Sequence, residues 1–415
     1  MPSIPFLACF PFVILLLAIA IAPLAWPRFW HKNRNKGWVV VLLSLPAALW
    51  LVVNLPLELG RTAEEYVSFI VLLGSLFVIS GGISLTGDIE ATPKVNTIFL
   101  LIGAILANFV GTTGASMLLI RPLLRTNSER KHTGHIPVFF IFLVSNIGGC
   151  LTPLADPPLF LGYLRGVPFF WTLTLWPEWL VSVGLVLSVF YAWDTIAHRK
   201  ESARAVARDR REIAPLRLSG RLNFVFLLGV LLSVALAAPA PYREIIMIAM
   251  TVLSLRFTKS SVRKHNRFSW GPIVEVAVLF AGIFVTMVPL LKILEIRGAD
   301  LGVTKPWQFF WLTGGLSSFL DNAPTYLTFF SLGKGVTAAA GSVPAIAGVG
   351  VELLRAISCG AVFMGAMTYI GNGPNFMVKA IAEEQGVPVP HFFGYMAYST
   401  LILIPIFGLV SLWFF

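Results

Sequence analysis

The sequence predicts an all-α polytopic membrane protein, and three observations support this fold class. Of the 415 residues, 57% are hydrophobic and 12% are charged, whereas soluble domains carry roughly 25% charged residues. The apolar residues form long runs that suffice for about ten spans at ~20 residues each. Basic residues collect between these runs, as is typical of membrane topology. This composition excludes a soluble enzyme, a disordered protein and, despite the net charge of +11, a nucleic-acid-binding domain.

The first apolar run is similar to a signal peptide in length. No basic residue precedes it, however, and four basic residues follow it within residues 28–36. We therefore expect a retained helix whose N-terminus lies outside the cell. The expected helical segments are residues 4–26, 37–57, 66–86, 95–124, 136–164, 169–193, 222–238, 243–257, 271–294, 306–333, 343–384 and 391–415.

Lysine and arginine are distributed unequally between alternate loops. Residues 28–36, 121–131, 199–221 and 256–267 hold 21 of the 31 basic residues. Cytoplasmic loops carry such an excess of positive charge, so we assign these four loops to the cytoplasm. Both termini are then expected outside, in a multi-pass protein of a bacterial-type plasma or inner membrane.

Residues 95–124 do not fit a simple span. The segment lies between Lys94 and Arg125, which are both assigned to the cytoplasm. Thirty helical residues measure about 45 Å, whereas two crossings need about 60 Å. The middle of the segment reads Gly-Thr-Thr-Gly at residues 111–114. We therefore predict a re-entrant hairpin, which is tolerated where its turn is buried in protein or faces a wet cavity.

Residues 306–333 repeat this pattern from the opposite side. Lys305 and Lys334 flank the segment outside, and its middle reads Asp-Asn-Ala-Pro-Thr at residues 321–325. We predict a second re-entrant hairpin here. With the two hairpins removed, about ten full transmembrane helices remain.

The two halves of the chain are predicted to be inverted repeats. Each half has three spans, a hairpin, a broken span (residues 136–164 and 343–384) and a final span. Residues 149–158 match residues 365–374 at a constant offset of 216, with shared Gly, Thr and Pro and an Asp/Asn pair. Inverted repeats with broken helices are typical of secondary transporters. The predicted organisation is a first repeat at 1–193, a basic cytoplasmic linker at 194–221 and a second repeat at 222–415.

Two aspartates lie at the predicted breaks inside the membrane. A carboxylate at this depth costs several kcal/mol unless it is paired or hydrated. We interpret Asp156 and Asp321 as ion-binding or proton-coupling groups, with helix capping as the alternative. Both are expected to ligate Na⁺, because small hard cations prefer oxygen ligands. Further hydroxyl and amide ligands are expected at Asn146, Thr152, Asn322, Thr325, Thr368, Asn372, Asn375, Thr112 and Thr113.

Other charged residues of the spans are interpreted as structural. Glu178 is expected at the outer interface. Glu352 and Arg355 are three residues apart and are expected to neutralise each other on one helix.

At four stretches the chain resembles the NhaD-type sodium/proton antiporters of the ion transporter superfamily, which also contains arsenite permease-like and citrate or dicarboxylate carriers. The matching stretches are residues 111–117, 145–158, 320–325 and 368–375. The resemblance implies paired re-entrant hairpins, a scaffold that often dimerises, and an elevator-like movement that carries ions bound at these breaks. Two features depart from the pattern. Ala155 replaces an expected Gly, and the Ser-Asn-Thr signature of the dicarboxylate branch is absent.

The function predicted first is Na⁺/H⁺ antiport, in which buried aspartates bind Na⁺ or protons alternately. The alternative is a cation-coupled transporter of citrate or a dicarboxylate, and a non-transporting scaffold is the third possibility. An enzyme is not expected, since no nucleophile–base pair, P-loop or dinucleotide fingerprint is visible. The expected partners are small inorganic cations, the lipid bilayer and a second copy of the chain, with no nucleic acid. No cofactor is expected besides the transported Na⁺ and H⁺.

Overall fold

Long apolar helices dominate the computed structural model, which describes residues 4–341 and 343–415. Within these residues, seven helices are long and apolar enough to cross a membrane. In the described part of the chain, the strands form only two short two-stranded sheets. The predicted fold class, an all-α polytopic membrane protein, is confirmed.

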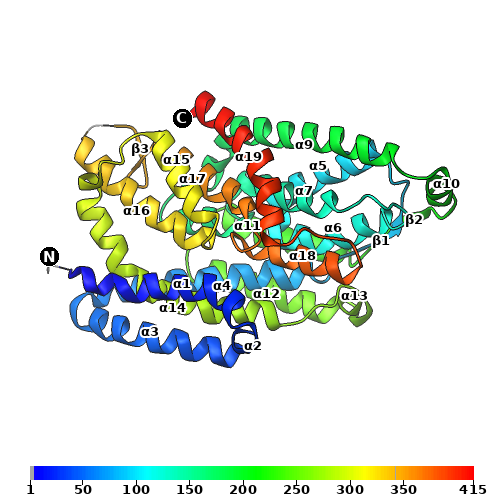
Figure 1. The fold of residues 1–415 in the computed structure, drawn as a ribbon. Coiled ribbons are helices and arrows are strands. Elements are labelled where there is room, and N and C mark those ends of the chain that lie inside the picture. The colour runs from blue at the N-terminus through cyan, green and yellow to red at the C-terminus, as the bar shows by residue number, and fades with distance from the viewer. Residues whose placement is uncertain (1–3, 342) are drawn as a thin grey trace.

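One group of helices, the first layer, combines the opening spans of both halves. Helix α14 packs against α1, α3 and α4, and α4 also packs against α11 and α12. Helices α1, α3, α4, α12 and α14 are labelled in the lower part of Figure 1, below the remaining helices. The elements of this layer are η1 (Phe6–Cys9), α1 (Phe10–Ala25), α2 (Pro27–Trp30), α3 (Asn33–Asn54), α4 (Pro56–Ser80), α11 (Leu222–Ala235), α12 (Tyr242–Phe257), α13 (Ser260–His265), α14 (Gly271–Arg297) and η4 (Gly298–Leu301).

Apart from α10, the remaining helices form the second layer, which contains every predicted hairpin and break. Helix α15 packs along α17, α16 along α8, and α5 along α6 and α9. Helix α16 also packs along α14 of the first layer. The elements of this layer are α5 (Pro93–Val110), α6 (Thr112–Thr126), α7 (His135–Leu143), η2 (Ile147–Cys150), α8 (Pro157–Leu164), η3 (Phe169–Leu175), α9 (Trp176–Arg199), α15 (Pro306–Ser317), α16 (Asn322–Ala340), α17 (Val351–Met364), η5 (Gly365–Met367), α18 (Gly373–Glu384) and α19 (Phe392–Phe414).

The helices are interrupted where the sequence motifs predict it. Helix α5 ends at Val110 and α6 begins at Thr112, with Gly111 between them at φ +79° and ψ 153°. Such a positive φ is readily adopted by glycine alone. The second hairpin breaks between Ser317 and Asn322, and α8 and α18 each begin after a non-helical loop. These interruptions create free helix ends deep in the protein.

Two predicted helical stretches contain strands instead. Residues 343–350 include an antiparallel pair of β3 (Ala345–Ile346) and β4 (Val349–Gly350). Gly341 and Gly348 adopt φ of +81° and +84° beside this pair, which is incompatible with a continuing helix. Within residues 66–86, α4 stops at Ser80 and β1 (Ser84–Asp88) follows.

The predicted linker at residues 194–221 is largely regular structure. Helix α9 continues to Arg199, and α10 (Ala203–Arg211) follows it. Strand β2 (Ala214–Ser219) then pairs antiparallel with β1, with Ser84 opposite Ser219. The strand pair ties the linker to the end of α4, in the first half of the chain.

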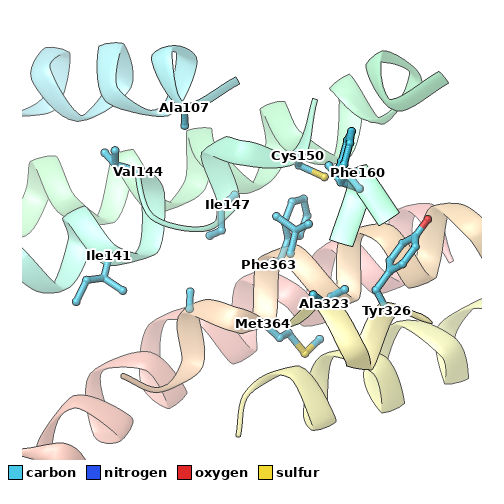
Figure 2. Packing of buried hydrophobic residues seen from close by; sticks show 14 of the residues in the cluster. Ala107, Ile141, Val144, Ile147, Cys150, Phe160, Ala323, Tyr326, Phe363 and Met364 are labelled. Atoms are coloured by element: carbon cyan, nitrogen blue, oxygen red, sulfur yellow. The ribbon is translucent and has the colours of Figure 1, made fainter. Parts of the chain in front are cut away.

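Apolar side chains of both halves fill the space between the broken helices. Figure 2 shows Ile147 and Phe160 of the first half facing Phe363, Ala323 and other residues of the second half. These side chains are buried and belong to one continuous core. Because lipid is as apolar as the protein interior, close packing and interhelical hydrogen bonds stabilise such contacts more than the hydrophobic effect does.

Candidate functional site

Asp156 and Asn372 occupy the same position at the start of two half-helices. Asp156 is the N-cap residue of α8 (φ −143°, ψ 141°), and Asn372 is the N-cap residue of α18 (φ −152°, ψ 142°). Neither side chain hydrogen-bonds to its own helix. Simple helix capping therefore does not account for Asp156, since its carboxylate faces other elements.

The carboxylate of Asp156 accepts three hydrogen bonds from three other segments. The hydroxyl of Thr112 and the amide of Asn372 each donate to Oδ1 at 3.2 Å. The amide of Asn322 donates to Oδ2 at 2.6 Å. All four residues are buried, and all four lie in the first turn or at the N-cap of a helix. Four helix N-termini thus converge on one carboxylate.

Asparagines extend this cluster across the two halves of the chain. The Oδ1 atom of Asn146, from the loop after α7, accepts a hydrogen bond from Asn372 at 3.2 Å. The Nδ2 atom of Asn146 donates to Asn375 at 2.7 Å. Asn375 in turn donates to the carbonyls of Gly365 and Thr368, each at 2.8 Å. The two broken-helix loops are therefore connected directly by side-chain amides.

The negative charge of this cluster has no basic counterpart in the part of the chain that the structure describes. No lysine, arginine or histidine forms an ion pair with Asp156 there. In addition, Oδ1 of Asn322 is buried with no hydrogen-bond partner in the structure. An unpaired buried carboxylate is costly, as is an unsatisfied buried carbonyl. A proton or a small cation on the carboxylate would relieve the first cost, and a bound cation or donor at Oδ1 of Asn322 would relieve the second. Oxygen atoms are the ligands that hard cations prefer.

Asp321 lies beside the cluster and caps a helix. Its Oδ1 accepts a hydrogen bond from the backbone amide of Ala323 at 3.0 Å, which caps α16. Its side chain is half-buried, and its neighbour in sequence, Asn322, contacts Asp156 directly. Thr325 donates to the backbone carbonyl of Asp321 at 3.0 Å. Asp321 is thus one residue removed from the hydrogen-bonded shell of Asp156.

Three further predicted residues lie near the cluster but do not bind the carboxylate, and two of them hydrogen-bond to backbone groups. Thr152 donates to the carbonyl of Asn108 at 2.6 Å. Thr368 donates to the carbonyl of Ser318 and accepts from the amide of Gly371 at 3.2 Å. Thr113 is half-buried next to Thr112. None of the three hydrogen-bonds to the Asp156 carboxylate in the structure.

Asn108 was missed by sequence reasoning. It lies in α5, where Nδ2 donates to the carbonyl of Gly148 at 2.7 Å and Oδ1 accepts from the amide of Leu151 at 2.9 Å. The side chain thus replaces backbone hydrogen bonds that the broken helix lacks. The available signal was a buried-looking asparagine in an apolar helix, four residues before Thr112.

Glu178 and Arg355 form an ion pair that the sequence analysis did not predict. The guanidinium of Arg355 contacts Oε1 of Glu178 at 2.5 Å from one nitrogen and 3.0 Å from Nε. Glu178 is fully buried rather than interfacial. The expected pair of Glu352 with Arg355 is replaced by this contact between α9 and α17, because the tertiary fold places a buried carboxylate within reach.

The whole chain, residues 1–415, matches the protein family CitMHS_2, whose description reads "Putative citrate transport". The chain belongs to this family. It has no match among curated proteins. As a CitMHS_2 member with several membrane-spanning helices, the protein is a multi-pass secondary transporter. The family assignment favours the predicted organic-anion alternative over Na⁺/H⁺ antiport, and it does not single out the NhaD type.

Proposed function

We propose that this CitMHS_2 protein transports a citrate-class organic anion, driven by a cation that binds at Asp156. The convergence of four helix N-termini on one buried cluster is the observation that carries this proposal. Each N-terminus bears roughly half a positive charge, and helix N-termini bind carboxylates and phosphates. Secondary transporters use the ends of broken helices in this way for anionic substrates.

A cation is needed because the cluster already contains a carboxylate. A citrate anion beside an ionised Asp156 would be repelled, whereas Na⁺ or a proton at Asp156 and Oδ1 of Asn322 would remove the repulsion. Binding of the anion and of the cation then favour each other, which couples their fluxes. In this proposal Asp321 adds a second negative group at the edge of the cluster. The carboxylate of Asp156 is positioned by Thr112, Asn146, Asn372 and Asn375.

Na⁺/H⁺ antiport is the second candidate. It is supported by the unpaired Asp156 carboxylate, which binds Na⁺ and a proton in competition if no anion enters. The helix N-termini would then serve only to stabilise the carboxylate. The family assignment gives this candidate less support than citrate transport.

Transport assays separate the two candidates. Purified protein in liposomes is expected to accumulate labelled citrate in a saturable way when a Na⁺ or proton gradient is imposed. Unlabelled citrate should compete, and protein-free liposomes are the control. Absence of uptake, combined with dissipation of a preformed pH gradient by Na⁺ in inverted vesicles, would reject citrate in favour of antiport.

We also propose that both termini lie outside the cytoplasm, as the distribution of basic residues suggests. Labelling of intact spheroplasts with an impermeant maleimide tests this orientation. Arg297→Cys should react from outside, whereas Lys200→Cys should react only after lysis. The native Cys9, Cys150 and Cys359 are buried and should give a low background.

A further inference from the structure

A cavity of about 200 Å³ lies beside Arg165, which follows α8, and Lys334 in the second half of α16. Most of its lining residues are charged, and they belong to α4, α14 and α16 or, in the case of Arg165, directly follow α8. Helices α4 and α14 belong to the first layer, and α8 and α16 to the second. The cavity therefore lies on the boundary between the two layers, and the site described above makes no use of its residues.

Two ion pairs in this cavity connect the layers. Arg165, directly after α8, contacts Glu65 of α4 at 3.0 Å. Lys334 of α16 contacts Glu295 of α14 at 3.7 Å. Each pair combines a base of the second layer with an acid of the first. We call these two pairs the interlayer pairs.

A third ion pair in the same cavity stays within the first layer. Lys292 of α14 contacts Glu58 of α4 at 3.1 Å. It also contacts Glu295 of its own helix at 3.3 Å. The Glu58–Lys292 pair has the same chemistry and surroundings as the interlayer pairs but does not cross the boundary.

The interlayer bases lie on the helices that also carry the Asp156 cluster. Helix α8 has Asp156 before its first residue and Arg165 after its last, about 14 Å apart along the axis at 1.5 Å per residue. Helix α16 begins with Asn322, which donates to Asp156, and holds Lys334 about 18 Å further along. A short helix is rigid, so movement at one end is transmitted to the other.

We propose that the interlayer pairs Glu65–Arg165 and Glu295–Lys334 form a reversible latch that holds the second layer against the first in this conformation. The latch residues act on transport as positioning residues, through α8 and α16, and release is required for the Asp156 cluster to change sides. Partly exposed ion pairs are weak, which suits a contact that must open in every cycle. The side chains of all four residues retain 14–32% exposure. The need for release rests on the proposed transport function.

Cross-linking tests the latch directly. Glu65→Cys with Arg165→Cys, bridged by a cleavable bifunctional thiol reagent, is expected to lose at least tenfold in citrate uptake and to regain it after cleavage. The matched control is Glu58→Cys with Lys292→Cys, bridged in the same way within the first layer, which should keep uptake within twofold. Unchanged uptake by the bridged Glu65/Arg165 variant would overturn the proposal.

A second measurement does not depend on the substrate. Spin labels at the exposed positions Ala63→Cys of α4 and Ala340→Cys of α16 report the distance between the layers. Glu65→Gln with Glu295→Gln should at least double the population at longer distance, and Glu58→Gln should leave it unchanged. A third variant keeps Glu295→Gln and swaps the charges of the other pair, Glu65→Arg with Arg165→Glu. Its long-distance population should fall toward that of the single variant Glu295→Gln. An unaltered distance distribution in the double Gln variant refutes the latch, whereas absence of citrate uptake by the native protein refutes the proposed substrate alone.

Discussion

The side-chain amide of Asn372 donates a hydrogen bond to the carboxylate of Asp156, 3.2 Å away. The two residues are 216 positions apart and hold the same place in the two matching motifs. They also share nearly the same backbone conformation at the start of a half-helix. A two-fold axis relating two inverted repeats would bring equivalent residues into contact in this way. Two identical repeats would place two like groups there, whereas this chain has one carboxylate and one amide.

Replacing the carboxylate of Asp156 should abolish coupled transport. Asp156→Asn keeps the size of the side chain and removes its charge, so the cation loses its anionic ligand. We expect citrate uptake to fall at least 100-fold, about 2.7 kcal/mol, with little loss of folded protein in detergent. Asp300→Asn, at an exposed residue of η4, is the control for removal of one negative charge. Retained, gradient-driven uptake in Asp156→Asn would contradict the assigned role.

Removing the unpartnered carbonyl of Asn322 should weaken cation binding selectively. Asn322→Ala deletes both the donor to Asp156 and the free Oδ1. We expect the Na⁺ or proton concentration for half-maximal uptake to rise roughly tenfold, about 1.4 kcal/mol. Thr325→Val on the same helix removes a hydroxyl that bonds to the backbone carbonyl of Asp321. In this variant the cation concentration for half-maximal uptake should stay within twofold of that of the native protein. An equal change in both variants would show that α16 is merely destabilised.

The two glycines that flank Asn372 should respond differently to substitution. A Cβ at Gly371 would lie 2.6 Å from the carbonyl oxygen of Gly365 and 2.8 Å from that of Ser317, whereas a Cβ at Gly373 meets nothing within 4 Å. Overpacking of this kind typically costs about 1–3 kcal/mol. Gly371→Ala should therefore lower the unfolding temperature and impair uptake, and Gly373→Ala should change neither. Similar melting curves for the two variants would disprove the packing argument.

The buried Glu178–Arg355 pair should be more sensitive than an exposed pair. Removal of one member of a buried pair costs about 3–5 kcal/mol, because the other charge is left unpaired. Glu178 is fully buried, so Glu178→Gln should markedly lower thermal stability in detergent. Glu212→Gln, which breaks the exposed pair with Arg208, should cost about 0–1 kcal/mol. A comparable loss in both variants would count against the buried pair.

The strand pair β1–β2 should be stabilised by mild acid. Burial raises the pKa of Asp209, which accepts from the amide of Ala91, and also that of Asp88 at the end of β1. A carboxyl group with a raised folded-state pKa favours folding while it is protonated, and this contribution is lost as the pH rises through the raised pKa. Hydrogen exchange of residues 84–91 should therefore show more protection, after correction for the intrinsic rate, just above the normal aspartate range than at neutral pH. Asp88→Asn with Asp209→Asn should remove the difference.

Local sequence patterns predicted most of the helical elements and the positions of their breaks. Glycine at 111 and Asp-Asn-Ala-Pro at 321–324 each disrupt a helix through backbone preferences of the residues themselves, and the structure breaks there. The direct contacts of Asp156 with Thr112, Asn322 and Asn372 link residues that the motifs had already grouped. The motifs did not indicate which of these polar side chains contact the carboxylate of Asp156. Some of them, such as Thr152, hydrogen-bond to the backbone instead.

The sequence by itself determined the membrane class, the order of the spans and the set of residues at the breaks, because hydrophobicity and backbone preference act over a few neighbouring residues. Only the tertiary structure decided that Arg355 pairs with Glu178, that β1 pairs with β2, that Asn108 supports a broken helix, and that two ion pairs span the layers. These contacts join residues far apart in the chain, most of them 100 or more positions apart. Their formation depends on which helix faces come together, and no local pattern encodes that choice.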